Sequence, residues 1–319
     1  MRIGLIGYGS IGRRHCQNLL ELGYNDITLL RTNGKTNEYG LDEKYDINVF
    51  LKTPFDFIII SNPTALHYKF LSELLPNNMN VLVEKPIACN YNEAGSLSNL
   101  ILKYEGIGMS AYNLRFHPCI QKVNELIKIG NIGKIYTARF FVGQYLPDWR
   151  PHVDYRDSYS SKKSLGGGVV LDLIHEIDLA LFFCGDVKSN FHSIVGKLSN
   201  LEIETEDIAE IHYQSMNNSI VSIHLDYLTQ GYSRWFELIG ENYRIHCDLF
   251  SSEVKVIGEK NKNESLYSYK EFNRNDMYLS LIKYYVDCIK LNIKPKPSLA
   301  DGLSSLNLAL KTKSFLEEK

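Results

Sequence analysis

The stretch that decides the fold is the first one, Met1-Arg-Ile-Gly-Leu-Ile-Gly-Tyr-Gly-Ser-Ile-Gly-Arg-Arg-His15. Residues 2–6 indicate a short buried strand, and glycines then follow in the spacing G-x-G-x-x-G. Apolar residues recur at helical spacing after the last glycine of this motif. A strand, a glycine turn and a helix in this order indicate dinucleotide binding. The alternative is a tight turn that only packs well.

Each glycine of the motif has its own expected task. Gly7 permits the tight turn, Gly9 lets a pyrophosphate approach the backbone, and Gly12 lets the helix pack close to the strand. The free N–H groups and the positive dipole end of the helix then face the phosphates. We therefore expect Gly7, Gly9, Ser10, Ile11 and Gly12 to hold the cofactor's phosphates.

The composition is that of a globular protein long enough for two domains. The chain has 319 residues, of which 44% are hydrophobic and 23% charged. Its net charge of −2 does not indicate a nucleic-acid partner, and no apolar run reaches membrane-spanning length. The chain enters a core strand at once, without room for a signal peptide. The six cysteines are scattered and form no C-x-x-C pair, which favours reduced thiols in the cytoplasm and no metal site.

The first third of the chain alternates strands and helices. This pattern predicts parallel β-α-β units and a doubly wound sheet, that is, a Rossmann domain. The unbroken run Phe57-Ile-Ile-Ile60 is typical of a strand buried on both faces. The predicted strands after the first are 26–30, 55–60, 80–83 and 106–111.

The pattern changes near Phe116–Pro118, where we place a boundary between domains 1–117 and 118–319. The second half predicts an α+β domain with a large, open, mostly antiparallel sheet and one inserted helix, 169–183, after a glycine run. A helix of about ten residues opens this domain and ends at Gly130, and two helices, 276–291 and 299–317, close it. The predicted strands are 135–142, 208–214, 219–227, 235–240, 243–249 and 254–257.

Arg31 follows the second predicted strand. An NAD-binding fold usually places an acidic residue here for the ribose hydroxyls, whereas an arginine suits the 2′-phosphate of NADP. The residue type therefore favours NADP over NAD, with Thr32, Asn33 and Lys35 as helpers. The alternative is an ordinary surface arginine.

Two further stretches directly follow predicted strands, at the carboxyl edge where open α/β sheets bind ligands. Ser61, Asn62 and Pro63 follow the third strand and would pack against the nicotinamide ribose and ring. Glu84 and Lys85 follow the fourth, and a lysine in a partly desolvated crevice can join proton transfer. We place His67 with these cofactor-facing residues. The alternative for the first stretch is a helix that is simply opened by its proline. The alternative for the second is a surface lysine before a turn.

The richest group of polar residues in the second half is Gly166-Gly-Gly-Val-Val-Leu-Asp172-Leu-Ile-His175-Glu-Ile-Asp178. Asp172 and His175 are three residues apart and so share a helix face, as do His175 and Asp178. A histidine positioned by a carboxylate is a common acid/base unit near neutral pH. The alternative is an amphipathic helix whose polar residues satisfy caps and the opposing domain.

Four motifs in order resemble the glucose–fructose oxidoreductase/inositol dehydrogenase (Gfo/Idh/MocA) family over nearly the full chain. They are Gly7-Tyr-Gly-Ser-Ile-Gly12, Glu84-Lys-Pro86, Leu114-Arg-Phe-His-Pro118 and Gly166-Gly-Gly-x-x-x-Asp172-x-x-His175. The late Gly240-Glu and the region from Tyr278 to Gly302 extend the resemblance. It implies an N-terminal Rossmann domain, a C-terminal domain with a large open sheet, and NAD(P)-dependent oxidation or reduction of sugars, sugar nucleotides or cyclitols.

The resemblance also implies roles for residues. Lys85 would touch substrate and cofactor, His175 would be the acid/base, and Asp172 would shape the site. In inositol dehydrogenase-like members the aspartate and histidine are often four apart rather than three, so the resemblance carries over to His175 more directly than to Asp172. The family's His-x-x-Asp register is kept by Asp178.

Two stretches are the candidates for binding substrate. Tyr112, Asn113 and Arg115, with His117, follow the fifth strand and are expected to line a cleft. A second stretch leads into the glycine run and suits a phosphate, nucleotide or carboxylate, since arginine recognises planar anions. The alternative for this loop is that aromatic packing orders it. Its candidate residues are Trp149, Arg150, His152, Tyr155 and Arg156.

These observations predict an NAD(P)-dependent oxidoreductase acting on CH–OH groups of a sugar-type substrate. The His-Glu-x-Asp variant resembles members associated with surface-polysaccharide and sialic-acid-like sugars. Two other functions stay open: a non-catalytic nucleotide-binding sensor or scaffold of the same fold, and a reductase of a non-sugar such as an imine or a bilin. The open sheet would need a partner, which predicts a homodimer or homotetramer.

Overall fold

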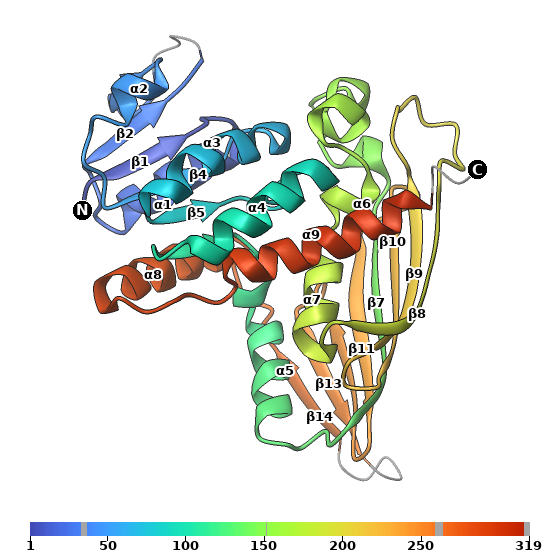
Figure 1. Cartoon of the computed structure of the whole chain (residues 1–319). Helices are drawn as coiled ribbons and strands as arrows, with labels where there is room; N and C mark the ends of the chain where they lie inside the picture. The colour runs from blue at the N-terminus through green and yellow to red at the C-terminus, as the bar shows by residue number, and fades with distance from the viewer. Residues whose placement is uncertain (33–36, 151, 259–263, 316–319) are drawn as a thin grey trace. The chain divides into compact units, whose positions relative to one another are not determined.

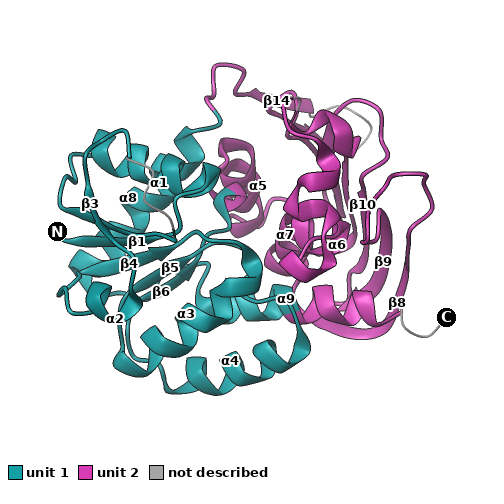
Figure 2. Ribbon diagram, turned by 90° about the horizontal axis from the view of Figure 1, so that it is seen from above, with its two compact units in different colours: residues 1–113, 274–306 teal, residues 114–273, 307–319 magenta. Residues whose placement is uncertain are grey.

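A computed structural model describes residues 1–32, 37–150, 152–258 and 264–315. The chain divides into two compact units (Figure 2). Unit 1 contains residues 1–113 and 274–306, and unit 2 contains residues 114–273 and 307–319. The predicted division at residues 117 and 118 assigns 274–306 to the second domain, whereas the structure packs this segment with the first. Within unit 1, helix α8 (Asp276–Leu291) packs on helix α1 (Ser10–Glu21), and the Tyr285 hydroxyl donates to the Ile107 carbonyl at 2.8 Å.

Unit 1 is built around a parallel sheet of six strands in the order β3-β2-β1-β4-β5-β6. Helices α1 and α8 cover one face of the sheet, and α3 and α4 cover the other (Figure 2). The central strands are buried along their whole length because both faces are covered. The predicted doubly wound fold is thereby confirmed. The elements are β1 (Ile3–Ile6), β2 (Ile27–Leu30), β3 (Asp42–Lys44), α2 (Ile47–Phe50), β4 (Phe57–Ile60), α3 (His67–Leu74), β5 (Val81–Val83), α4 (Tyr91–Lys103) and β6 (Gly108–Ser110).

Unit 2 is an eight-stranded sheet in the order β14-β13-β12-β11-β7-β10-β9-β8. Every neighbouring pair is antiparallel except β7 with β10. Helices α5, α6 and α7 pack on one face (Figure 1). The predicted α+β domain is confirmed. Its elements are α5 (Pro118–Lys128), β7 (Ile135–Gly143), α6 (Val169–Asp172), α7 (His175–Cys184), β8 (Val187–Gly196), β9 (Ile208–Ser215), β10 (Ile220–Asp226), β11 (Ser233–Gly240), β12 (Arg244–Asp248), β13 (Glu253–Ile257) and β14 (Glu264–Ser268).

The sequence prediction misses three strands and a break in one helix. The missed strands β3, β8 and β14 all lie at sheet edges, where polar and exposed residues weaken the apolar signal. The single helix predicted over 169–183 is wrong, because the chain leaves the helix after Asp172 and a second helix begins at His175. The closing helix α9 spans Leu299–Ser314. Among the described residues, no helix combines the length and apolarity that crossing a membrane requires.

The outer face of the unit 2 sheet, opposite α5, α6 and α7, carries a row of stacked rings. The ring of Trp235 stacks on Phe141 at 5.4 Å, and Phe141 stacks on His224 at 4.6 Å with an interplanar angle of 3°. The His224 ring nitrogens lie 2.6 Å from Glu210 Oε1 and 2.7 Å from Asp226 Oδ2. Burial acts to lower the pKa of His224, but the hydrogen bonds with Asp226 and Glu210 outweigh it and raise the pKa to about 9.

Stability should therefore depend on His224 at alkaline pH. The folded pKa of about 9 lies above the ordinary value of 6.5, so the contribution is complete below 6.5 and is lost as pH rises through 9. We expect His224→Gln to remove about 2 kcal/mol of stability at pH 6 and much less at pH 10, measured by urea unfolding. The exposed neighbour His212 is the matched control, as His212→Gln should follow the unchanged protein. Parallel pH profiles for His224→Gln and the unchanged chain would contradict the assignment.

Candidate functional site

The glycine loop of unit 1 has the geometry that its sequence predicts. Gly7 follows β1 with a φ of +90°, and a Cβ there would lie 2.6 Å from the backbone nitrogen of Asn62. A Cβ on Gly12 would collide with the Gly7 carbonyl oxygen. A Cβ on Gly9 would meet no described atom within 4 Å, so open space lies before the first turn of α1. The loop therefore fits a pyrophosphate at the start of α1, beside Ser10 and Ile11.

The segment after β4, residues 61–63, contacts the glycine loop through Ser61. Ser61 is buried, and its hydroxyl donates toward the carbonyls of Ile6 and Gly7, at 3.1 and 3.0 Å. Pro63 is exposed at the same edge, whereas Asn62 is half-buried. Ser61 thus holds the glycine turn in place, and Pro63 is the residue of this group open to a ligand.

The Glu84-Lys85-Pro86 segment begins where β5 ends, next to β4 in the parallel sheet. Glu84 and Pro86 are buried, and Lys85 between them is half-buried. Glu84 Oε1 lies 2.7 Å from Nε2 of His15, a buried residue of α1 that the sequence analysis missed. The sequence signal for it is a polar residue in the apolar stripe formed by Gly12, Cys16 and Leu19.

His67 lies in the core of unit 1 with 1% of its surface exposed. Its Nδ1 lies 2.7 Å from the Pro86 carbonyl oxygen and its Nε2 lies 2.8 Å from that of Asn62. Burial lowers the pKa of His67, and the two carbonyl acceptors act in the opposite direction. His67 thus lies in the core and links the segment after β4 to the segment after β5.

Arg31 at the end of β2 contacts an acidic residue. Its Nη1 lies 2.6 Å from Glu43 Oε1, and both side chains are largely buried. Glu43 also accepts from Asn37 at 2.6 Å and from the Tyr45 hydroxyl at 2.5 Å. The guanidinium of Arg31 lies over the Tyr8 ring, 5.1 Å from its centre. Thr32 is exposed, and the proposed helpers Asn33 and Lys35 lie outside the described residues.

In unit 2, the glycine run and helix α6 position Asp172. Gly168 has a φ of +114°, and a Cβ on it would collide with the Glu206 carboxylate. The Asp172 side chain is 6% exposed and accepts from the Tyr227 hydroxyl at 2.7 Å. Burial, with the Asp172 carboxylate, raises the pKa of Tyr227, so this hydroxyl stays a donor. Tyr227 is a second residue that the sequence analysis missed, since it is the last residue of an ordinary predicted strand.

His175 is the first residue of α7 and is 8% exposed. The two carboxylates that follow it on α7 are held by buried arginines. Asp178 accepts two bonds from Arg115, at 2.7 and 2.8 Å, and Glu176 accepts two from Arg234, at 2.6 and 2.8 Å. Planar guanidinium–carboxylate pairs of this kind fix geometry as well as charge. The start of α7, and with it His175, is therefore held from two directions.

The pairing of Arg115 with Asp178 occupies one of the residues that the sequence predicts at the substrate. Arg115 faces the Asp178 carboxylate and the Phe182 ring, 4.5 Å away, and is 7% exposed. Tyr112 and Asn113, described within unit 1, are also buried. The carboxylate of Asp178, which keeps the family's register to His175, is hydrogen-bonded to Arg115. These residues lie in the core of their units, and their expected contact with substrate stays a prediction.

The loop before the glycine run splits into two parts. Trp149 donates to the Gln144 carbonyl at 3.0 Å and meets the Tyr227 ring edge-on at 5.2 Å, beside Asp172. Arg150 lies 5.2 Å from the centre of the Tyr159 ring. Arg156 instead pairs with Asp154 at 2.6 Å on the surface. The structure thus brings Trp149 close to the Asp172–Tyr227 pair. The other candidates, Tyr155 and His152, are half-buried and exposed, respectively.

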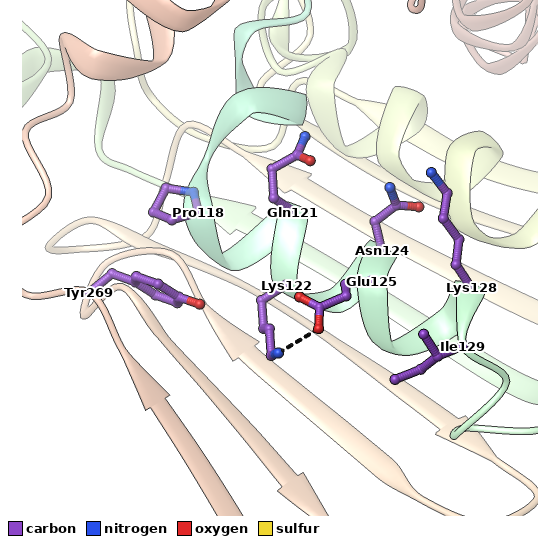
Figure 3. Close-up of a pocket in the computed structure, with 8 residues that line it drawn as sticks. All are labelled: Pro118, Gln121, Lys122, Asn124, Glu125, Lys128, Ile129 and Tyr269. Atoms are coloured by element: carbon purple, nitrogen blue, oxygen red, sulfur yellow. Dashed lines mark hydrogen bonds and ion pairs between the residues drawn. The ribbon is translucent and has the colours of Figure 1, made fainter.

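A separate open hollow of about 600 Å³ lies along the solvent face of α5 (Figure 3). Lys122 and Glu125, three residues apart on α5, form an ion pair on its wall at 2.9 Å. It contains none of the predicted catalytic or cofactor residues. Its lining residues are Pro118, Gln121, Lys122, Asn124, Glu125, Lys128, Ile129 and Tyr269. Among the described residues, no group of three or more His, Cys, Asp and Glu side chains is arranged to hold a metal ion.

Known proteins resemble both units in sequence and the whole chain in fold. The chain is 26% identical to myo-inositol 2-dehydrogenase of Thermotoga maritima, across 100% of this chain and 97% of that protein. It is 23% identical to glucose-6-phosphate 3-dehydrogenase of Bacillus subtilis, across 70% and 66%. A solved structure of levoglucosan dehydrogenase with NADH has a TM-score of 0.88 at 17% identity and covers 100% of this chain and 98% of that one.

Two family models match separate parts of the chain. Residues 1–112 match the oxidoreductase family with an NAD-binding Rossmann fold, and residues 120–246 match the GFO/IDH/MocA C-terminal domain. The first match contains the glycine loop, Arg31 and Lys85, and the second contains Asp172 and His175. Because both halves match in the expected order, the chain belongs to the GFO/IDH/MocA family of NAD-binding oxidoreductases.

Proposed function

We propose that this chain transfers a hydride between a nicotinamide cofactor and a hydroxyl or keto carbon of a sugar, sugar nucleotide or cyclitol. The observation that carries the proposal is the full-length similarity to a myo-inositol dehydrogenase, together with Lys85 and His175 at the matching motifs. The pattern His175-Glu-Ile-Asp178 favours surface-polysaccharide or sialic-acid-like sugars within this class. We place the reaction in the cytoplasm, consistent with six cysteines that form no disulfide.

The proposed chemistry divides between two residues. In the oxidative direction, His175 takes the proton of the substrate hydroxyl as the carbon–oxygen bond becomes a carbonyl. Lys85 hydrogen-bonds the same oxygen and stabilises the negative charge that develops on it. Asp172, oriented by Tyr227, shapes the substrate side. The bound nicotinamide supplies the hydride acceptor, or the donor in the reverse direction.

The cofactor would lie along the carboxyl edge of the parallel sheet. The backbone N–H groups at the start of α1 suit its phosphates, and the open space at Gly9 admits them. Pro63 and Lys85 would face the nicotinamide half. We propose NADP as the preferred cofactor because two guanidiniums, those of Arg31 and Arg13, lie over the Tyr8 ring at 5.1 and 5.4 Å. Glu43 partly offsets this charge, which keeps NAD usable.

We also propose that a second copy of this chain docks on the outer face of the unit 2 sheet. Arg139 pairs across strands with Glu237, and the row continues to His246 and Lys255. This row carries side chains of both signs, so its acidic and basic groups can pair with the same surface turned by a two-fold axis. The stacked rings of Trp235 and Phe141 supply the apolar centre.

Removing either reacting group should abolish turnover without removing the cofactor. We expect Lys85→Met and His175→Asn to lower kcat by about 10²- to 10⁴-fold, since each loses one proton-handling or charge-stabilising group. Turnover is followed by nicotinamide absorbance with myo-inositol, glucose 6-phosphate and nucleotide sugars. Binding of reduced cofactor, measured by its fluorescence, should survive. His192→Asn, on an exposed strand residue, is the control. Near-normal turnover in both reacting-group variants would remove the mechanism.

Cofactor choice should depend on Arg31. We expect the unchanged chain to prefer NADP in kcat/KM, and Arg31→Ala to lower that preference about tenfold by removing a charge-assisted contact to the 2′-phosphate. Glu43→Gln should act in the opposite direction, because it releases Arg31 from its partner. A clear preference for NAD in the unchanged chain would sink the assignment.

Self-association is tested by light scattering at working concentration. The mass should be that of a dimer or tetramer, and Phe141→Glu should lower it by placing a charge in the centre of the outer face. A monomeric unchanged chain would refute the docking surface.

A further inference from the structure

Both chain neighbours of Lys85 are held by a buried histidine, and the two histidines come from different helices of unit 1. His15 on α1 contacts the Glu84 carboxylate through Nε2 at 2.7 Å. His67 on α3 contacts the Pro86 carbonyl through Nδ1 at 2.7 Å. Lys85 is therefore preceded and followed by residues that are fixed from opposite directions in the fold.

The first contact links Lys85 to the helix that follows the glycine loop. An ionised carboxylate only accepts hydrogen bonds, so Nε2 of His15 carries the proton that is shared with Glu84. His15 Nδ1 has no hydrogen-bond partner in the part of the chain that the structure describes. The rings of His15 and Tyr278 meet in a T-shaped arrangement, with their centres 6.2 Å apart. One polar bond and one aromatic contact thus set the position of this imidazole, and its polar bond is directed at Glu84.

The second contact links the segments after β4 and β5. The second ring nitrogen of His67 lies 2.8 Å from the Asn62 carbonyl oxygen. A neutral imidazole donates through one nitrogen and a protonated one through both, whereas a carbonyl only accepts. Both facing atoms are acceptors, so a neutral His67 donates to one carbonyl at a time. The ring is buried, so no water replaces that bond when it is lost. His67 therefore fixes the spacing between the residue before Pro63 and the residue after Lys85.

A lysine needs such support to act at a defined atom. Its four-carbon stem carries about 2 kcal/mol of rotamer entropy, and a reacting group displaced by about 1 Å can lose two orders of magnitude in rate. Fixing the backbone on both sides of Lys85 restricts where its ammonium group can reach. The two histidines are otherwise costly, because each is a polar ring in an apolar core.

We propose that His15 and His67 form a clamp that positions Lys85, and that His15 couples this position to α1, the helix at the cofactor's phosphates. The clamp is a pair of positioning residues, which touch neither substrate nor cofactor. The proposal deepens the proposed function, from which it takes the role of Lys85.

The test measures Lys85 itself in the full-length chain. Lysines are reductively methylated with ¹³C-formaldehyde, and the Lys85 resonance is identified by its loss in Lys85→Arg. We expect this resonance to broaden in His15→Phe and His67→Phe. In His15→Phe, its titration midpoint should also rise by about half a pH unit, because the Glu84 carboxylate loses its partner beside the ammonium group. His15→Gln keeps a donor and should restore the resonance. His192→Phe, on an exposed strand residue, should leave it unchanged.

Two readouts keep this result separate from general damage. Retained binding of reduced cofactor, measured by its fluorescence, shows that unit 1 of each phenylalanine variant is folded. Should a phenylalanine variant not fold, Glu84→Met removes the acceptor of the His15 bond at a similar side-chain volume, and it should also broaden the resonance. An unchanged Lys85 resonance in the folded variants overturns the clamp. Undiminished turnover in Lys85→Met overturns the proposed function instead, and the resonance still decides the clamp.

Discussion

Close contact between the glycine loop and the ends of two parallel strands is the constraint on which unit 1 depends. Gly7 and Gly12 carry no side chains where a Cβ would meet Asn62 or the Gly7 carbonyl. Only this contact lets α1 approach the sheet closely enough for His15 to reach Glu84 across the strand ends. The same absence of side chains leaves backbone N–H groups for phosphates. In this unit, the missing side chains of the loop glycines therefore account both for the close packing of α1 and for the space offered to phosphates.

In unit 2, buried charge pairs hold the start of α7. Arg115 with Asp178 and Arg234 with Glu176 each form two hydrogen bonds in the core, and both carboxylates lie in the first turn of α7. Burying such pairs is costly in desolvation, and breaking one costs about 3 to 5 kcal/mol because a charge is left alone. Their value lies in geometry: they hold the first turn of α7, where His175 begins the helix immediately after the chain leaves α6.

Much of the fold follows from the sequence because local signals agree with the tertiary structure. The strand, glycine turn and helix over residues 3–21 were predictable from spacing alone, as were the apolar strands of both sheets. The edge strands β3 and β14 were not, since their residues are polar and pair on one side only. The helix break after Asp172 was also missed, because residues 169–183 remain apolar at helical spacing across it.

The candidate site was predictable at the level of motifs but not of partners. Lys85, Asp172 and His175 stand in recognisable patterns, whereas the partners of Arg115 and Glu84 are 63 and 69 residues away in the chain. Such pairs have no spacing rule, so Arg115 was expected at the substrate and His15 was not considered. The same limit applies to Tyr227, which lies 55 residues from the Asp172 carboxylate that it orients.

The central claim is that Lys85 and His175 act on one oxygen atom of the substrate. A crystal structure with bound nicotinamide cofactor and a turned-over sugar tests it most directly. The account predicts Lys85 Nζ and an imidazole nitrogen of His175 both within about 3 Å of the reacting oxygen, with the hydride-bearing carbon facing the nicotinamide. A complex in which either group lies out of hydrogen-bond reach of that oxygen would contradict it.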